Sequence, residues 1–379
     1  MKKNIFIIQL CLLCKYAKNI AMYPLLLLIF NTYSTAGQSH QELKPIAIAK
    51  GGVTTEVAIT QYQDAVFATV VALKGEDGQL KVIYFNKDGN NNYSRVAEST
   101  GGSVYKVDVI SLYNGIIVVA VIDSNHELKL ISYKLAPGKL NRLGEYPMLI
   151  TTDFKLSPIG KNGIALATRN INTGGEMNVW LLRVDANGEF EMLDHDHTGY
   201  VSDFDITGAA NIVTAVRDSE GELKLISFDY SNVLNGNLQS SSRLTRCTES
   251  TNRGKVFQVT ITALATNPIV SVVRDSDNEI SLLGFHIANC GLNFLLKDSS
   301  GGRATKVACS DKNLNNQFKV AVIDSNGNLK FIVYYLNGVS VSRTGAGIAG
   351  KYKDIAVSGN WVTAGIKDDN TLEVVLWGW

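Results

Sequence analysis

The chain has few cysteines, and they do not suggest a disulfide framework. Only Cys247, Cys290 and Cys309 lie beyond residue 36. Three cysteines are an odd and small number, which is not typical of a domain stabilised by several disulfides. A Cys247–Cys290 bridge stays open, although the strand spacing described below places these residues at opposite ends of neighbouring sheets. Cys309 lies in the apolar run KVACS, where we expect a small core residue.

The chain also has little net charge and lacks the common cofactor motifs. Beyond residue 36 there are 32 basic residues against 35 acidic ones, a balance of −3. No overall basic field exists, which argues against nucleic acid as a partner. The motifs G-x-x-x-x-G-K-[ST], H-E-x-x-H and G-x-S-x-G are absent. No cofactor is therefore predicted.

The first 36 residues have the features of an export signal. Two apolar runs, at 5–14 and 23–30, are separated by a segment with Lys15 and Lys18, and 34–36 supplies small residues for cleavage. Neither run reaches the roughly 20 residues that span a bilayer. We predict a signal peptide over 1–36 and a single domain over 37–379. The mature protein is then secreted or periplasmic and has no membrane span; an uncleaved anchor is the alternative.

The rest of the chain repeats one pattern seven times. Two short, nearly continuous apolar runs flank a turn, as in VTAVRDSEGELKLISF at 213–228. Such runs predict β-hairpins buried on both faces, and Asp with Gly or Asn favours the tight turn between them. The hairpins are expected at 66–85, 116–133, 163–182, 211–230, 268–286, 319–335 and 361–379.

A further strand is expected on each side of every hairpin. Apolar runs such as 256–262 precede the hairpins, and runs such as 139–145 follow them. Four antiparallel strands, repeated seven times about 42 to 58 residues apart, resemble a seven-bladed β-propeller. The resemblance implies an all-β fold in which the N-terminal strand 43–52 completes the last blade. Because no tryptophan-aspartate dipeptide ends each unit, a typical WD-repeat protein is not indicated.

Residue types that recur at one position in most units are expected to build the fold. Six of seven units carry an aromatic residue late in the hairpin, which suits packing between sheets. Aspartates at the turns are expected to cap them. Basic residues just before the turns are expected to pair with these aspartates, or alternatively to form a ring that meets anions. The aspartates are Asp123, Asp218, Asp275, Asp324 and Asp368, and the basic residues are Lys74, Arg169, Arg217, Arg274 and Lys367.

The connections between units are the candidate ligand-binding sites. In propellers these connections share a face with the hairpin turns, and that face commonly binds partners. Carboxylates and hydroxyls there suit sugar hydroxyl groups, whereas hydroxyl-bonded turns that close each blade are the alternative. The candidate residues are Glu98, Ser99, Asp196, His197, Glu249, Asp298 and Ser299.

The first strand of each unit is expected to line a central channel, where propeller enzymes bind small ligands. Asp203 and Asp205 would face the same side of one strand, and like charges raise a pKa as acid–base catalysis requires. Asp203 and Asp153 are the catalytic candidates; a salt-bridged mouth is the alternative. The polar residues at the mouth are Glu56, Lys106, Asp153, Asp203, Gln258, Lys306 and Asp354.

Two segments depart from the common pattern. Asp194-His195-Asp196-His197 holds the one histidine cluster, which makes His195 and His197 candidate metal ligands. Alternation on a strand would separate the histidines from the aspartates, and we favour a solvated loop. Residues 231–254 predict a mobile polar loop or a lengthened hairpin.

Together these patterns favour a secreted binding module that recognises a glycan or a protein through its loop face. One alternative is a propeller enzyme, a glycoside hydrolase or lyase with its active site at the channel mouth. Another is a structural scaffold of an envelope assembly, in which 231–254 makes the contact.

Overall fold

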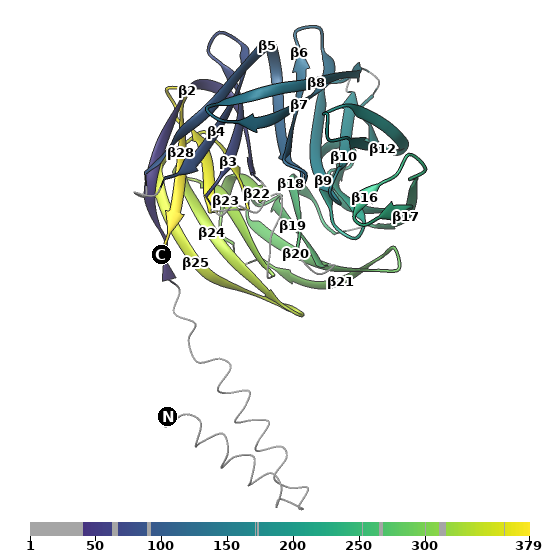
Figure 1. Ribbon diagram of the computed structural model, residues 1–379. Helices are drawn as coiled ribbons and strands as arrows, with labels where there is room; N and C mark the ends of the chain where they lie inside the picture. The colour runs from purple at the N-terminus through teal and green to yellow at the C-terminus, as the bar shows by residue number, and fades with distance from the viewer. Residues whose placement is uncertain are drawn as a thin grey trace, which may run out of the picture. The chain divides into compact units, whose positions relative to one another are not determined.

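The computed structural model describes residues 41–62, 67–88, 92–170, 172, 174–251, 253–264, 268–299, 301–310, 316–359 and 361–379. The predicted signal peptide lies outside these residues. The described chain contains no α-helix and is built from β-strands, which confirms the predicted all-β class (Figure 1). Accordingly, no helix in this part of the chain has the length and apolar character needed to cross a membrane.

Seven antiparallel hairpins form the framework, at the seven places where they were predicted. Their strands are nearly continuous in apolar residues because both faces are buried, as in β6, in which every residue is buried. The pairs are β3–β4 (Thr69–Gly75, Gln79–Lys87), β6–β7 (Ile116–Asp123, Glu127–Ala136), β10–β11 (Gly163–Asn170, Glu176–Val184), β13–β14 (Ile212–Asp218, Leu223–Tyr230), β19–β20 (Pro268–Asp275, Ile280–Ala288), β23–β24 (Gln317–Asp324, Asn328–Asn337) and β27–β28 (Val362–Ile366, Thr371–Gly378).

Each hairpin lies between an inner strand that pairs with its first strand and an outer strand that pairs with its second, which makes a four-strand group. The inner strands are β2 (Lys44–Gln61), β5 (Tyr93–Ser111), β9 (Asp153–Ile159), β12 (Phe190–Gly208), β18 (Val256–Ala263), β22 (Ala304–Cys309) and β26 (Asp354–Val357). The outer strands are β5, β8 (Lys139–Ile150), β12, β17 (Leu244–Ser250), β21 (Gly291–Asp298), β25 (Ser340–Lys351) and β2. Because β2, β5 and β12 each serve two groups, the groups join into large sheets, of which two have ten and seven strands.

The two ends of the described chain pair with one another. The first part of β2 runs antiparallel to β28, from Lys44 opposite Gly378 onwards, and Figure 1 shows the purple β2 beside the yellow β28. The two-residue strand β1 (Gln41–Glu42) runs parallel to β25. Between β1 and β2, Leu43 is 2% exposed and packs in a cluster that includes Trp377. The predicted pairing of 43–52 with the last hairpin is confirmed.

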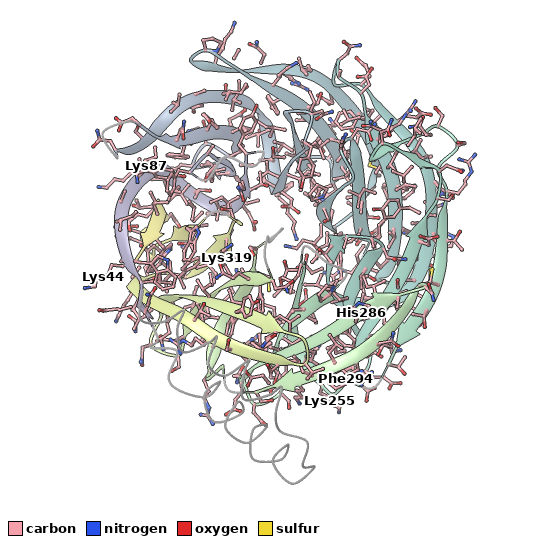
Figure 2. All side chains as sticks on the ribbon, turned by 60° about the horizontal axis from the view of Figure 1, so that its bottom comes forward. Lys44, Lys87, Lys255, His286, Phe294 and Lys319 are labelled. Carbon is pink, nitrogen blue, oxygen red and sulfur yellow. A yellow bond between two sulfur atoms is a disulfide. The ribbon has the colours of Figure 1, made fainter. Side chains whose placement is uncertain are left out.

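The core lies between neighbouring groups. The recurring aromatic position is buried in every group, and Phe285 of β20 packs with Val213 and Ala215 of β13 in the preceding group. Figure 2 shows the side chains on the strands, with Phe294 of the outer strand β21, 42% exposed, at the periphery of the view. The aromatic residues therefore pack between successive groups as predicted. The residues at this position are Phe85, Tyr133, Leu182, Phe228, Phe285, Tyr334 and Trp377.

Aspartates cap the hairpin turns, as predicted for four of the five. Oδ1 of Asp123 accepts hydrogen bonds from the backbone N–H groups of Asn125 and Glu127, at 2.8 and 3.1 Å. The same two bonds form at the turns of Asp218, Asp275 and Asp324. In the last hairpin the prediction of Asp368 is wrong, because the neighbouring Asp369 accepts the bond, from the N–H of Thr371 at 2.9 Å.

The predicted pairing of the preceding basic residues with the turn aspartates is also wrong. Lysines from the second hairpin strand supply the cation instead, with Lys129, Lys224 and Lys330 lying 2.7, 3.0 and 3.0 Å from Asp123, Asp218 and Asp324. Side chains alternate between the two faces of a strand. A residue directly before an aspartate therefore points to the opposite face of the strand. The basic side chains at this position make other contacts.

Candidate functional site

The inner strands of all seven groups line one cavity. Its volume is about 330 Å³, and residues of β2, β5, β9, β12, β18, β22 and β26 contribute to its wall. That volume lies at the lower end of the range for small-molecule sites. The polar and charged residues of the wall include Glu56, Lys106, Asp108, Lys155, Asp205, Gln258, Lys306 and Asp354.

A β-bulge recurs where the inner strands reach the cavity. The register toward the hairpin shifts by one residue in β2, β5, β12, β18 and β22. A bulge redirects the side chain of its extra residue, and here that side chain is exposed in all five strands. The exposed residues are Thr55, Tyr105, Ser202, Phe257 and Thr305. The residue that follows the bulge lines the cavity in four of these strands, as Glu56, Lys106, Gln258 and Lys306.

Asp203 and Asp205 both bind the neighbouring inner strand, β18. Oδ2 of Asp203 accepts the N–H of Val259 at 2.9 Å. Oδ2 of Asp205 accepts the hydroxyl of Thr260 at 2.7 Å and the N–H of Ile261 at 3.0 Å. The two carboxylates thus face the same side, as predicted from their spacing, and they fasten β12 to β18.

The electrostatic prediction for Asp203 had the direction right and the main cause wrong. Burial raises the pKa of this carboxyl, while the Val259 N–H and the charge of Lys155 lower it, and Asp205 contributes only weakly. The dominant cause is therefore desolvation rather than repulsion between the two aspartates.

Other polar residues of the cavity join inner strands in the same way. Oδ2 of Asp108 on β5 accepts the N–H of Leu156 on β9 at 3.0 Å, and burial raises the pKa of Asp108. Gln258 on β18 accepts the N–H of Val307 at 3.1 Å and donates to its carbonyl at 2.8 Å. Since adjacent inner strands share no ladder, these side chains take the place of backbone bonds between groups.

Ion pairs join further inner strands, as the salt-bridged alternative predicted. Asp153, a catalytic candidate, binds Lys106 of the preceding inner strand and Arg169 of its own group, the latter at 2.8 Å. Lys306 binds Asp354 of the next inner strand. Both oxygens of Asp153 therefore accept hydrogen bonds from cations.

Two charged groups of the cavity remain available. Within the described part of the chain, the side chains of Glu56 and Lys155 form neither a hydrogen bond nor an ion pair. Burial raises the pKa of Glu56 against the opposing charge of Lys106. Burial lowers the pKa of Lys155, but the charges of Asp205, Asp108 and other carboxylates outweigh it and raise the pKa overall. The cavity thus offers a carboxyl group and an ammonium group to a ligand.

The cavity also contains the free thiol of the described chain. Cys309 lies at the end of β22, half-buried, in the wall of the cavity. Burial raises the pKa of this thiol. The sequence predicted a small core residue here, and the residue does pack partly against the adjoining apolar cluster.

The predicted ligand-binding loops are mostly strands, which corrects the sequence interpretation. Glu98 and Ser99 lie in β5, Asp196 and His197 in β12, Glu249 in β17, and Asp298 ends β21 with Ser299 directly after it. The prediction of loops was wrong because β5 and β12 continue unbroken from the outer position of one group to the inner position of the next. The candidates lie on four different outer strands and do not form one site.

Several of these outer residues have partners on the protein. Glu249 binds Arg246 at 2.7 Å, and Glu98 binds Arg95 three residues earlier. The hydroxyl groups of Ser299 and Ser281 lie 3.0 Å apart. These contacts stabilise the outer strands and leave fewer free groups for a sugar than the sequence suggested.

The histidine cluster also lies on a strand, so the prediction of a solvated loop was wrong. The rings of His195 and His197 lie 5.6 Å apart on one side of β12, and Asp194 on the other side accepts the N–H of Leu244 at 2.9 Å. His195 stacks on Trp180 with 4.8 Å between ring centroids. Within the described residues, no group of three or more His, Cys, Asp or Glu side chains is arranged to hold a metal ion.

Segment 231–254 is a lengthened hairpin, one of its two predicted forms. It contains the short strands β15 (Val233–Leu234) and β16 (Asn237–Leu238) and then the outer strand β17. Leu238 is 1% exposed, and its N–H donates to Oδ1 of Asn162 at 2.9 Å. The segment is therefore packed into the fold, and its removal would delete an outer strand.

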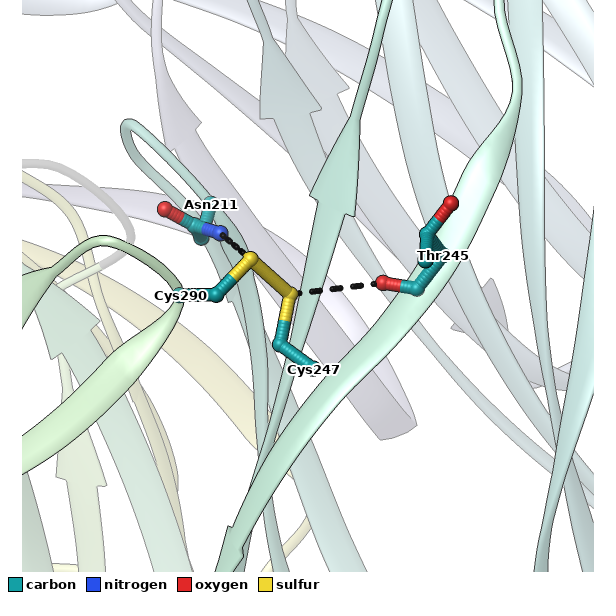
Figure 3. The surroundings of a disulfide bond; sticks show 4 residues. All are labelled: Asn211, Thr245, Cys247 and Cys290. Atoms are coloured by element: carbon teal, nitrogen blue, oxygen red, sulfur yellow. Dashed lines mark hydrogen bonds between the residues drawn. A yellow bond between two sulfur atoms is a disulfide. The ribbon is translucent and has the colours of Figure 1, made fainter.

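Cys247 and Cys290 form a disulfide, with 5.3 Å between their Cα atoms (Figure 3). The prediction that they lie at opposite ends of neighbouring sheets was wrong. Cys247 is the extra residue where the β14–β17 register shifts between Ser227 and Phe228, and Cys290 lies in the β20–β21 turn. Such a bulge redirects a side chain, and here it brings the thiol to the adjacent turn.

The described residues thus concentrate available polar groups at one place, the cavity between the inner strands. The outer candidates are dispersed, and the catalytic candidates Asp203 and Asp153 hold neighbouring strands and cations. No protein-family model and no curated protein matches this chain.

Proposed function

We propose that residues 41–379 form a seven-bladed β-propeller that binds a saccharide at the mouth of its central cavity. Support for the propeller comes from seven four-strand groups in sequence order, from inner strands that line one cavity, and from β2, which pairs with β28. Pairing the two ends of a propeller leaves no edge strand exposed.

The observation that carries the saccharide proposal is the pair of available charged groups in the cavity. The side chains of Glu56 and Lys155 form no hydrogen bond and no ion pair with any described residue, while the surrounding carboxylates fasten the inner strands. A sugar hydroxyl both donates and accepts hydrogen bonds. It can therefore donate to Glu56 and accept from Lys155. The cavity wall carries more carboxylates than lysines. These carboxylates would repel an anion, but they do not repel an uncharged hydroxyl group.

Binding is favoured over catalysis by the contacts of the acidic residues. Both oxygens of Asp153 and Oδ2 of Asp203 accept hydrogen bonds from the protein, so these carboxylates already serve to hold the fold together. Glu56 is the residue that an enzyme would use, because burial raises its pKa. Hydrolysis of a bound saccharide is thus the second candidate function.

We further propose that the protein is secreted or periplasmic. The disulfide between Cys247 and Cys290 is the structural feature that supports this location, because disulfides persist in oxidising compartments. It joins the outer edges of two successive groups, where no backbone ladder connects them.

The proposal is tested by screening the purified protein on an array of neutral and acidic oligosaccharides and by titration calorimetry of the hits. Glu56→Gln and Lys155→Met are each expected to weaken binding about tenfold or more, because a charged group then loses its hydrogen bond with the sugar. Glu98→Gln is the matched control on an outer strand and should leave the affinity unchanged. Reducing-end assays on the same ligands detect hydrolysis.

The outcomes separate the alternatives. Absence of binding to every saccharide would refute the proposal. Weaker binding by Glu98→Gln together with unchanged binding by Glu56→Gln would move the ligand to the outer strands.

A further inference from the structure

A cationic and aromatic cluster lies at the rim of the cavity. Phe257, the extra residue of the bulge in β18, is 44% exposed and directly precedes Gln258, which lines the cavity. The guanidinium carbon of Arg217 on β13 lies 5.9 Å from the centroid of the Phe257 ring, and that of Arg274 on β19 lies 5.4 Å from it. Two arginines from successive groups therefore meet one exposed ring.

The charge of these arginines is not neutralised by the described part of the protein. The side chain of Arg217 makes no hydrogen bond and no ion pair there, and the side chain of Arg274 donates only to Oδ1 of Asn278, at 2.6 Å. The Nε–H groups of both arginines are buried without a hydrogen-bond partner, which is rare for buried polar groups. In the pairing of β18 with β19, Arg274 lies opposite the uncharged Gln258. In the pairing of β12 with β13, Arg217 lies opposite Asp203, whose Oδ2 accepts a hydrogen bond from β18.

The equivalent position of other groups lacks this excess of positive charge. Arg169 also has a buried Nε–H without a partner, but its two terminal nitrogens bind Asp153 and the backbone carbonyl of Ser202, so its charge is paired. Lys74 lies 5.3 Å from the ring of Tyr105 and faces Glu56 across the strand pair. Only the rim beside Phe257 combines two cations with an exposed ring in the described residues.

We infer that Arg217, Phe257 and Arg274 form a subsite for the carboxylate of an acidic sugar, a hexuronic acid residue, which rests on the proposed saccharide binding. A guanidinium group is planar and matches a carboxylate with two parallel hydrogen bonds. The exposed face of Phe257 can pack against the apolar C–H groups of a sugar ring. An oligosaccharide then places its carboxylate on the rim and its next residue in the cavity, toward Glu56 and Lys155.

The test uses the full protein, a disaccharide that joins one galacturonic acid residue to one neutral hexose, and the methyl ester of that disaccharide. Arg217→Gln is expected to weaken binding of the acid about tenfold or more and to leave the ester unchanged, because only the acid offers a charged, bidentate acceptor. Phe257→Leu should weaken both ligands. Lys74→Gln is the matched control and should change neither affinity. A sulfated and a phosphorylated sugar distinguish a carboxylate subsite from a general anion site.

A change of less than about twofold for the acid with Arg217→Gln, or an equal loss for acid and ester, would overturn the inference while leaving the cavity proposal intact. The opposite case is a rim subsite without saccharide binding in the cavity. It is tested by titrating galacturonic acid monomer and following the NMR signals of the arginine Nε–H groups. A shift of the Arg217 signal that is unaffected by Glu56→Gln, with no binding of the neutral ester, would support the rim subsite and refute saccharide binding in the cavity.

Discussion

The pairing of the two chain ends predicts a large loss of stability when Leu43 is shortened. Leu43 is 2% exposed and packs with Phe331, Tyr352 and Trp377, and its N–H donates to the carbonyl of Ala346 at 2.9 Å. Leu43→Ala keeps that backbone bond and removes buried methyl groups from the side chain. Leu→Ala in a core costs about 2–5 kcal/mol, a large part of the roughly 5–15 kcal/mol by which a domain is stable.

The matched control lies five residues further along the same segment. Ile48 is 52% exposed on β2, so Ile48→Ala should cost less than about 1 kcal/mol. Both variants are compared by guanidinium unfolding followed by far-UV circular dichroism. At about 2 °C for each kcal/mol in a chain of this size, Leu43→Ala should also lower the melting temperature by about 4–10 °C.

The result that refutes the reasoning is a pair of equal, small effects. It would mean that residues before β2 do not pack against the last hairpin, and the proposed closed propeller would have to be abandoned. A loss of stability confined to Leu43→Ala, with an unchanged dependence of the unfolding free energy on denaturant, supports packing of Leu43 against the last hairpin. The slope of that dependence reports the surface exposed on unfolding.

Three further predictions concern the disulfide, a turn and the cavity. Replacing Cys247 and Cys290 by serine should cost up to about 4 kcal/mol in urea unfolding, because the bridge spans 43 residues and closes a long loop of the unfolded chain; an unchanged midpoint would contradict this. Burial tends to raise the pKa of Asp324, but the turn N–H groups and Lys330 lower it to about 2. Since the folded pKa lies below the unfolded value, the stabilisation is present above about pH 4 and lost as the pH falls toward 2, and Asp324→Asn should flatten acid unfolding there. Cys309 should react slowly with a small thiol reagent, since burial raises its pKa, and a bound oligosaccharide should slow the reaction further; equal rates with and without ligand would place the ligand elsewhere.

Much of the fold could be predicted because its signals are local. Alternating turns and apolar runs identified all seven hairpins, and the same reasoning identified the capping role of Asp123 and its equivalents. The pairing of the ends followed from a last group that lacked an outer strand. By contrast, the outer candidates such as Glu98 were misplaced, since residues that suit a turn can equally continue a long, bent strand.

The sequence predicted that the first strands line a central channel, but it did not show which charged residues of the cavity wall lack a partner. The mouth position was visible from the repeat, yet the sequence singled out Asp203 for the presence of Asp205, and the structure shows both binding β18. Lys155 was not singled out at all. Its alternation with Asp153 on one strand was the signal that would have found it, because residues two apart face the same side.

By itself, the sequence determined the strands, the hairpin turns and the order of the groups, because periodicity and turn chemistry act between residues close in the chain. Only the tertiary structure decided which carboxylates fasten neighbouring strands, which side chains the bulges turn outward, and that Cys247 meets Cys290. These features depend on how one group lies against the next, and that packing joins residues tens of positions apart whose distances no local pattern records.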